Sequence, residues 1–270
     1  MLNPEFSQNL LTPLITRSQA RYSAIPSPFL DEAAEFLVEQ LDLENLNCRA
    51  QLSQKQLFSL IRSHWIDQQL IHFFDENPNA MGIEIGSGLN TRFQRLSRRL
   101  AWPQFSWVDL DTPEAAAFNN GLLPITDNYR MKACDFDQEN WLQKAGWKTD
   151  LDLIVVIENR NVLSHRAQLK TLFSFLNEED WQTERNIHLV MDCCAPTFSR
   201  WHPSDTPGSA KSAQDVLHHL PLPATIIVEQ DLSLAPSALW KVAGHVYKRL
   251  AGAALWSGLH LKLTPNTSMF

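Results

Sequence analysis

The stretch Met81-Gly82-Ile83-Glu84-Ile85-Gly86-Ser87-Gly88-Leu89-Asn90-Thr91-Arg92 decides the fold. Apolar residues lead into an acid, two glycines stand one residue apart, and a helical pattern follows. Glycine lets the backbone turn sharply close to a ligand, and the start of a helix offers unpaired N–H groups. A strand, a glycine turn and a helix in this order predict a nucleotide-type cofactor at Gly86 and Gly88.

The spacing of the glycines separates the possible cofactors. A dinucleotide fingerprint needs a third glycine at position 91, where this chain has Thr91. An acid two residues before the first glycine, here Glu84, is typical of S-adenosylmethionine sites. The stretch therefore favours S-adenosylmethionine, with S-adenosylhomocysteine as the product, over a nicotinamide cofactor.

Beyond residue 80, short apolar stretches alternate with helical patterns. Strands are expected over 80–86, 105–110, 129–135, 151–157, 187–194, 224–231 and 255–264, and helices over 91–100, 112–119, 138–146, 165–178, 209–220 and 236–250. Such alternation predicts an α/β fold with a doubly wound, largely parallel sheet. Seven strands is the count of the class I methyltransferase fold.

Residues 1–76 lack this alternation of strands and helices. Residues 1–30 are punctuated by prolines and are either an arm folded over the site or a frayed end. Helices are expected over 31–41 and from Ser53 to about Asp75, the second opened by the capping-box spacing of Ser53 and Gln56. We expect an N-terminal arm and helical cap over 1–76 and a cofactor-binding core over 77–270, with an acceptor-side insertion at about 195–221.

Several blocks resemble the leucine carboxyl methyltransferase family. The glycine loop Gly86–Arg92, with Arg95-Leu96 and Trp107–Leu110 after it, is similar to the family pattern G-x-G-L-D-T-R…R-L…E-V-D-x-P. Arg62…Asp67 resembles the family's Arg-x-x-x-x-Asp helix, and Ala133–Leu142 its A-D-L-R-D…W-x-x-L block. The resemblance covers about residues 21–166. It implies a class I, S-adenosylmethionine-dependent O-methyltransferase.

Polar residues at the carboxyl ends of the expected strands are candidates for holding the cofactor, because ligands of such sheets bind there. Gly86 and Gly88 would line its methionine half, and Glu84 would organise the loop or face the sulfonium. Asp109 ends the second strand and would accept both ribose hydroxyls. Asp111 competes for that role, but before Thr112-Pro113 it is more typical of a helix N-cap.

The resemblance implies further contacts. Asp135 would take the adenine amino group, and the backbone N–H of Phe136 would meet a ring nitrogen. Arg62 would hold the methionine carboxylate by a two-pronged hydrogen bond. Glu158 follows the apolar fourth strand, where the family has an acid. The chain departs from the family at Asn90, which replaces Asp, and at Asn159, which replaces Gly.

The acceptor side has weaker signals. Trp201 and His202 lie in the expected insertion and are candidates for substrate binding. A carboxylate acceptor is ionised near pH 7 and needs no base, whereas a phenol would need one, for which His202 or His165 are candidates. The catalytic residue stays unassigned, and the adjacent His218-His219 read as helix surface rather than as metal ligands.

Composition limits the function further. A net charge of −7 argues against a nucleic-acid surface. Four cysteines without Cys-x-x-Cys spacing, and no recognisable signal peptide, indicate a reducing cytoplasm. No apolar run nears the roughly 18 residues of a membrane span.

The leading prediction is therefore an S-adenosylmethionine-dependent O-methyltransferase. It would act on a carboxylate or hydroxyl of a small-molecule or carrier-bound acceptor, with secondary metabolism as one setting. Two other classes stay open: a methyltransferase-like domain that binds or scaffolds without catalysis, and a nicotinamide-dependent oxidoreductase.

Overall fold

The computed structural model describes most of the chain. The described residues are 4–22, 30–43, 52–100, 104–124, 126–134, 141–158, 185–194, 212–220, 223–234 and 237–264. The helix expected over 165–178, and most of the insertion expected at about 195–221, lie outside these ranges.

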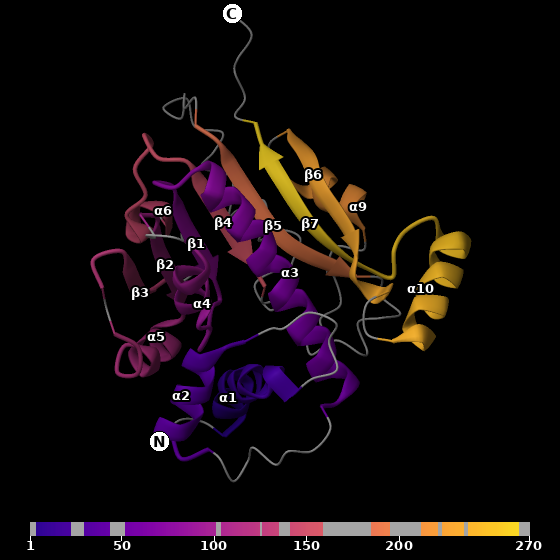
Figure 1. The fold of residues 1–270 in the computed structure, drawn as a ribbon. Coiled ribbons are helices and arrows are strands. Elements are labelled where there is room, and N and C mark those ends of the chain that lie inside the picture. The colour runs from indigo at the N-terminus through magenta and orange to yellow at the C-terminus, as the bar shows by residue number, and fades with distance from the viewer. Residues whose placement is uncertain are drawn as a thin grey trace, which may run out of the picture.

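Seven strands form one sheet in the order β3-β2-β1-β4-β5-β7-β6 (Figure 1). The first five in this order run parallel, and β7 runs antiparallel to both of its neighbours. The strands are β1 (Met81–Ile85), β2 (Ser106–Asp111), β3 (Tyr129–Ala133), β4 (Leu153–Ile157), β5 (Ile187–Cys194), β6 (Ala224–Asp231) and β7 (Trp256–Leu263). The predicted α/β class and the seven strands are confirmed.

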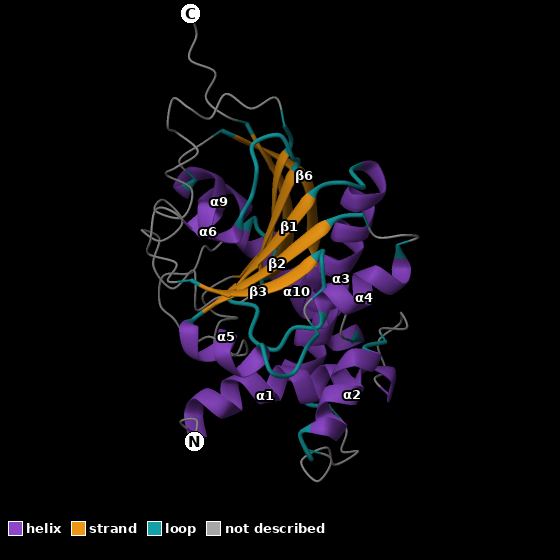
Figure 2. Ribbon diagram, turned by 90° about the vertical axis from the view of Figure 1, so that its left-hand side faces the viewer, coloured by secondary structure: helices purple, strands orange, loops and turns teal. Residues whose placement is uncertain are grey.

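Helices lie on both faces of this sheet, and Figure 2 shows the layers edge-on. They are α1 (Pro4–Ser18), α2 (Glu32–Gln40), α3 (Gln54–Glu76), α4 (Arg92–Arg99), α5 (Pro113–Asn119), α6 (Trp141–Ala145), α9 (Ala213–His219) and α10 (Ala238–Ala251), with short 3-10 turns at Ala20–Tyr22 (η1) and Leu232–Leu234. The capping box predicted at Ser53 and Gln56 opens α3. Thr112, and not Asp111, caps α5 by accepting a hydrogen bond from the Ala115 N–H at 3.3 Å, so that part of the prediction was wrong.

Each face of the sheet has its own hydrophobic core, because side chains alternate along each strand. Ile83, Ile85 and Leu110 belong to the core under α6 and α9. Trp107 and Trp256 belong to the core under α1, α2 and α3. β4 is buried along its whole length, as its unbroken apolar sequence predicted.

The N-terminal helices cross the edge of the sheet at which the parallel strands end (Figure 1). Residues 4–18 form α1 despite Pro13 inside the helix, and Leu14 is fully buried. The helix predicted over 31–41 is present as α2, and Ala34, Leu37 and Val38 are buried on one of its faces. Residues 4–18 thus form a helix packed on the protein and not a frayed end, while the N-terminal arm and the domain division at 76/77 stay predictions.

Two histidines are buried where β5 and β7 meet α3. His188 Nδ1 and His260 Nε2 are 2.9 Å apart, and the His188 ring centroid lies 4.8 Å from that of Phe73. Burial lowers the pKa of each to about 4, helped by Lys262 at His188 and by the neighbouring histidines His188 and His72 at His260. The pair is therefore neutral in the folded protein at neutral pH.

This pair should make the fold acid-sensitive. As pH falls from about 6.5 towards 4, unfolded histidines take up protons that the folded protein excludes, so the free energy of unfolding falls by at most about 1.4 kcal/mol per pH unit for each histidine. His260→Gln should make that fall shallower in urea unfolding at pH 7.5 and 5, while replacing the exposed His245 should not. Equal slopes for the wild type and His260→Gln would contradict this account.

Candidate functional site

The turn after β1 has the backbone that the sequence predicted. Gly86 and Gly88 both take left-handed conformations, with φ of 69° and 57°, which side chains other than glycine rarely adopt. The Gly86 N–H donates to the Leu110 carbonyl oxygen at 2.8 Å, which joins the turn to β2. The turn therefore stands at the carboxyl ends of β1 and β2, immediately before α4.

Asp111 is the acid at this turn. Its Oδ2 accepts from the Gly88 N–H at 2.6 Å and its Oδ1 from the Thr112 N–H at 2.7 Å. Asn119 holds the turn from the other side by donating to the Gly88 carbonyl oxygen at 3.0 Å. Each carboxylate oxygen of Asp111 has a second lone pair for a hydroxyl donor.

Helix α1 covers the turn. A Cβ built on Gly88 would lie 3.3 Å from Leu10 Cδ2, so the helix is in van der Waals range of the glycine backbone. Arg17, at the other end of α1, donates to the Leu89 carbonyl oxygen at 2.5 Å. These two contacts place the N-terminal helix directly over the candidate cofactor turn.

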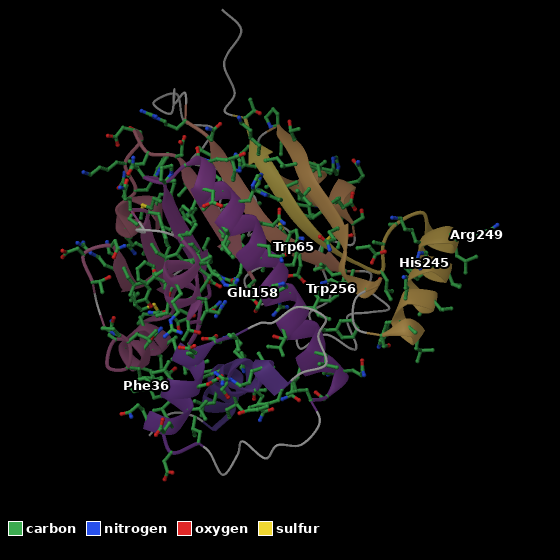
Figure 3. All side chains as sticks on the ribbon, in the orientation of Figure 1. Phe36, Trp65, Glu158, His245, Arg249 and Trp256 are labelled. Atoms are coloured by element: carbon green, nitrogen blue, oxygen red, sulfur yellow. The ribbon has the colours of Figure 1, made fainter. Side chains whose placement is uncertain are left out.

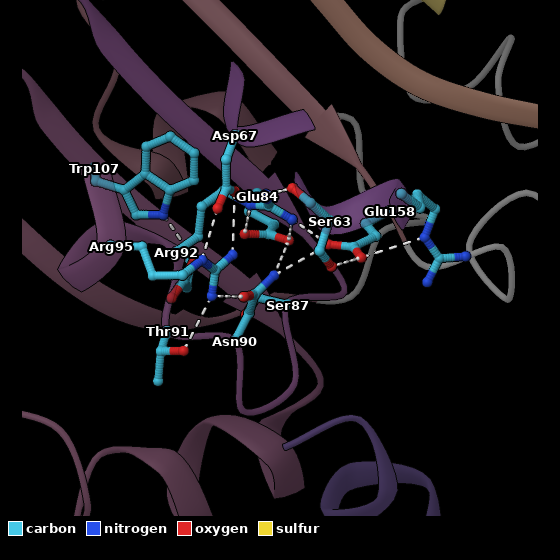
Figure 4. A network of polar contacts seen from close by, with 12 residues as sticks. Ser63, Asp67, Glu84, Ser87, Asn90, Thr91, Arg92, Arg95, Trp107 and Glu158 are labelled. Carbon is cyan, nitrogen blue, oxygen red and sulfur yellow. Dashed lines mark hydrogen bonds and ion pairs between the residues drawn. The ribbon is translucent and has the colours of Figure 1, made fainter. Parts of the chain in front are cut away.

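Next to the turn, charged side chains form a buried network around Arg92 (Figure 4). The fully buried guanidinium donates to Glu84 Oε2 at 3.0 Å and also pairs with Asp67 and Glu158. Asn90 donates to Glu84 Oε1 at 2.6 Å and to Glu158 Oε2 at 3.3 Å. Three carboxylates from α3, β1 and the end of β4 therefore converge on one arginine.

Arg95 extends the network towards the N-terminal helices. It bonds Asp67 Oδ2 at 2.7 Å and Asp31 Oδ2 at 2.8 Å, and Arg17 Nε lies 3.3 Å from the same Asp31 oxygen. Arg62 joins at the other end, with Nε 3.2 Å from Glu158 Oε1. We call this set the arginine–carboxylate cluster; its members are Arg17, Arg62, Arg92, Arg95, Asp31, Asp67, Glu84 and Glu158.

Two acids of the cluster titrate in opposite directions. Burial raises the pKa of Glu84, and the negative charge of Glu158 adds to this, against the attraction of Arg92. Burial also opposes ionisation of Glu158, but Arg92 and Arg62 outweigh it and lower its pKa to about 2. Glu158 is thus the firmly charged anchor of the cluster.

Asp109 lies beside the cluster but faces the core. Its Oδ1 accepts from Trp107 Nε1 at 2.8 Å, and its Oδ2 accepts from the Tyr129 hydroxyl at 2.8 Å. Burial, followed by the charge of Glu84, raises the pKa of Asp109 to about 8. Both oxygens are engaged inside the core and the residue is 1% exposed, whereas Asp111 contacts the glycine turn.

The structure brings together part of the predicted site. Gly86 and Gly88 form the turn, and Arg62, Glu84 and Glu158 meet through Arg92 and one another. Asp135, Phe136, His165, Trp201 and His202 lie outside the described residues, so their roles stay predictions.

Sequence reasoning missed the role of Arg92 and Arg95 and the hydrogen bond that joins Asp111 to the glycine turn. The signal was present in both cases. Arg92 and Arg95 belong to the glycine-loop pattern, and Asp111-Thr112-Pro113 meets the Asp-x-Pro ending of E-V-D-x-P. Arg17 and Asp31 had no such signal, because the contacts that join them to the glycine loop and α4, Arg17 with Leu89 and Asp31 with Arg95, span more than 60 residues of sequence.

Solved structures with a similar architecture include methyltransferases. A protein from Thermobifida fusca assigned as a methyltransferase aligns with a TM-score of 0.53 and 11% identity, over 98% of this chain and 100% of that one. The carbon methyltransferase CurJ aligns at 0.50 and 11% identity, over 95% of this chain and 67% of that one. The pyocyanin biosynthetic protein PhzM aligns at 0.50 and 12% identity, over 85% and 61%. The fold is thus that of class I methyltransferases.

Sequence comparison adds no closer relationship. No protein-family model matches the chain, and no curated protein matches it. Among the described residues, no helix is long and apolar enough to cross a membrane, and no group of three or more His, Cys, Asp and Glu side chains could hold a metal ion.

We expect Arg92 to contribute strongly to the stability of the fold, because it joins the carboxylates of the cluster. Arg92→Ala leaves three buried carboxylates without their shared cation, so the free energy of unfolding should fall by about 3–5 kcal/mol. The matched control is Arg98→Ala on the same helix, whose pair with Glu32 is exposed and should cost about 1 kcal/mol or less. If urea unfolding gave similar losses for both variants, the cluster would not be the anchor described here.

The neutral form of Asp109 gives a second test. Because its folded pKa of about 8 lies above the unfolded value of about 3.9, the folded protein holds a proton that the unfolded chain releases. The stability that this proton contributes should be lost as pH rises towards 8, by up to about 1.4 kcal/mol per pH unit.

Asp109→Asn has no titrating proton, so it should flatten that loss. Its carbonyl oxygen can still accept from Trp107 Nε1, and its amide nitrogen can donate to the Tyr129 hydroxyl oxygen in a reversed hydrogen bond. Urea unfolding at pH 6 and pH 8 measures the difference, with the exposed Asp127→Asn as the control. A slope that Asp109→Asn leaves unchanged would show that Asp109 is ionised in the folded state.

Proposed function

We propose that the chain is an S-adenosylmethionine-dependent methyltransferase whose cofactor binds at the Gly86–Gly88 turn. The observation that carries the proposal is the pair of left-handed glycines at the carboxyl end of β1, with the Asp111 carboxylate on the Gly88 N–H. In a parallel sheet this is the edge at which ligands bind. The methyltransferase fold supports the same reading.

The residues present fit the cofactor. Gly86 and Gly88 bring the backbone of the turn to the edge of the sheet where ligands bind, and Asp111 has lone pairs for two ribose hydroxyls. Leu10 packs on Gly88, so binding would need this side chain to move aside. We therefore move the ribose role from Asp109 to Asp111. Arg62 lies at the outer end of the cluster, next to Glu158, and is proposed to meet the methionine carboxylate.

When bound, the cofactor supplies a methyl group on a positively charged sulfur. Direct displacement at that methyl needs alignment and exclusion of water more than acid–base chemistry. Leu10 of α1 packs on Gly88, and Arg17 ties α1 to the glycine loop, so we propose that α1 helps to exclude water from the site. The cluster beneath the turn keeps the loop in place.

The acceptor is proposed to be a carboxylate or hydroxyl of a small molecule or carrier-bound intermediate. The support is the resemblance of the glycine loop to that of carboxyl methyltransferases. In this chain, Thr91, Arg92 and Arg95 of that pattern all take part in the polar network. A carboxylate acceptor would need no base. Trp201 and His202 remain proposed acceptor contacts, and His165 and His202 proposed bases for a hydroxyl.

One observation favours a second candidate, a domain that binds the cofactor without turnover. Glu84 and Glu158 both pair with Arg92, and Arg62 pairs with Glu158, so all three side chains already have partners within the protein. Such a cluster could serve stability alone. Calorimetric binding of S-adenosylhomocysteine, without transfer of labelled methyl to any member of a panel of carboxylates and phenols, would favour this candidate over the enzyme.

The ribose assignment makes the proposal testable. S-adenosylhomocysteine at 100 times its dissociation constant should stabilise the wild type by about 2.7 kcal/mol in thermal unfolding. Asp111→Ala should lose about 1.5–3 kcal/mol of binding free energy, the scale of a hydrogen bond to a charged group.

Asp109→Asn is the matched control, because it changes the acid two residues away and should keep the affinity. Circular dichroism of both variants separates lost binding from lost folding. No stabilisation of the wild type at millimolar ligand would refute the cofactor, and loss of affinity in Asp109→Asn alone would return the ribose to Asp109.

A further inference from the structure

Helix α10 carries an apolar stripe that no described residue covers. Its inner face, with Trp240, Gly244 and Tyr247, turns towards the molecule, and Trp240 stacks edge-on against Phe58 at 5.0 Å. Residues three and four apart share one side of a helix. On the outer side this spacing lines up four exposed residues: Leu239 (78%), Val242 (62%), Val246 (53%) and Leu250 (83%).

Basic residues flank this stripe. Between the inner face and the stripe lie Lys241, His245, Lys248 and Arg249, and the helix contains no acid. The whole chain has a net charge of −7, so α10 is a basic exception on an acidic molecule. Figure 3 shows His245 and Arg249 on this outlying helix. We call α10 with its stripe and bases the basic ridge.

A second surface has the opposite character. A groove of about 460 Å³ lies between α2 and η1 and is lined by Ser18, Arg21, Tyr22, Glu32, Glu35, Phe36, Val38 and Glu39. Tyr22 and Phe36 are 74% and 55% exposed. Glu35 pairs with Arg21 and Glu32 with Arg98, while acids still outnumber bases in the lining. We call it the acidic groove.

We propose that the basic ridge of one molecule docks in the acidic groove of a second copy of this chain. The two surfaces together hold most of the large exposed apolar side chains of the described residues, which monomers rarely gather in patches. Their charges are complementary, which favours and orients such a contact. α2 and α10 lie on opposite sides of the molecule, so one chain cannot make the contact with itself (Figures 1 and 3).

The charges also argue against other occupants of the ridge. Two α10 helices packed on each other would bring like-charged flanks together, which is unfavourable. A negatively charged membrane would attract the ridge but repel the acidic remainder of the chain. A ridge-to-groove contact is head-to-tail, so it closes into a ring or continues as a chain of molecules.

Sedimentation velocity of the full chain over a range of concentrations is the first test. The wild type should self-associate, and Leu239→Ser and Leu250→Ser should each weaken association by about tenfold, because each removes an exposed leucine that the contact would bury. Ile227→Ser on β6 is the matched control, because it removes an exposed apolar residue outside both surfaces and should change nothing.

Charge reversal then identifies the partner surfaces. Lys248→Glu with Arg249→Glu on the ridge, and Glu39→Lys in the groove, should each weaken association when alone. Mixing the two variant proteins should restore it, since each mixed contact again joins opposite charges. All three residues are exposed, so circular dichroism should show folded proteins.

A wild type that stays monomeric would overturn the proposal, as would association that the Leu239, Leu250 and charge variants leave unchanged. Association that is weakened by the ridge variants but unaffected by Glu39→Lys would mean that the ridge packs on another surface. Co-sedimentation of a monomeric wild type with phosphatidylserine vesicles, lost in Leu239→Ser, would assign the ridge to a membrane instead.

Discussion

The rest of the structure depends on the pairing of one buried arginine with three carboxylates. Arg92 starts α4, yet its partners come from α3, β1 and the end of β4. Each of these charges would be costly to bury alone, because desolvation of an ion exceeds what an imperfect pair returns. The four segments therefore have to assemble together, and the glycine turn between β1 and α4 is positioned by that assembly.

The balance of buried charges also explains one difference from the carboxyl methyltransferase pattern that the glycine loop resembles. Asn90 stands where the carboxyl methyltransferases have an aspartate. Its amide donates to both Glu84 and Glu158 and its carbonyl accepts from Arg95 at 3.3 Å. An aspartate in this position would add a negative charge between two carboxylates, whereas the amide supplies the donor that they need. The substitution thus suits the local charge balance.

Much of the fold could be predicted from local patterns. Apolar runs such as Leu153–Ile157, the capping spacing at Ser53 and the glycine turn each depend on neighbours in sequence. The direction of the Asp109 and Asp111 side chains could not be read in this way. Asp109 and Asp111 are two residues apart, so their side chains lie on the same face of β2. Only the pairing of β2 with β1 decides which of them reaches the Gly88 N–H. Likewise, α1 owes its place to Leu10 and Arg17, which contact residues more than 70 positions away.

The contact between α1 and Gly88 has a consequence for timing. A ligand bound at this turn, as proposed above, would have to displace Leu10, and Arg17 ties the same helix to the Leu89 carbonyl oxygen. Movements of whole helices take microseconds to milliseconds, far longer than the breaking of a single hydrogen bond. The residence time of such a ligand would then be governed by the N-terminal helix, and a substitution in α1 would alter its exchange without contacting it.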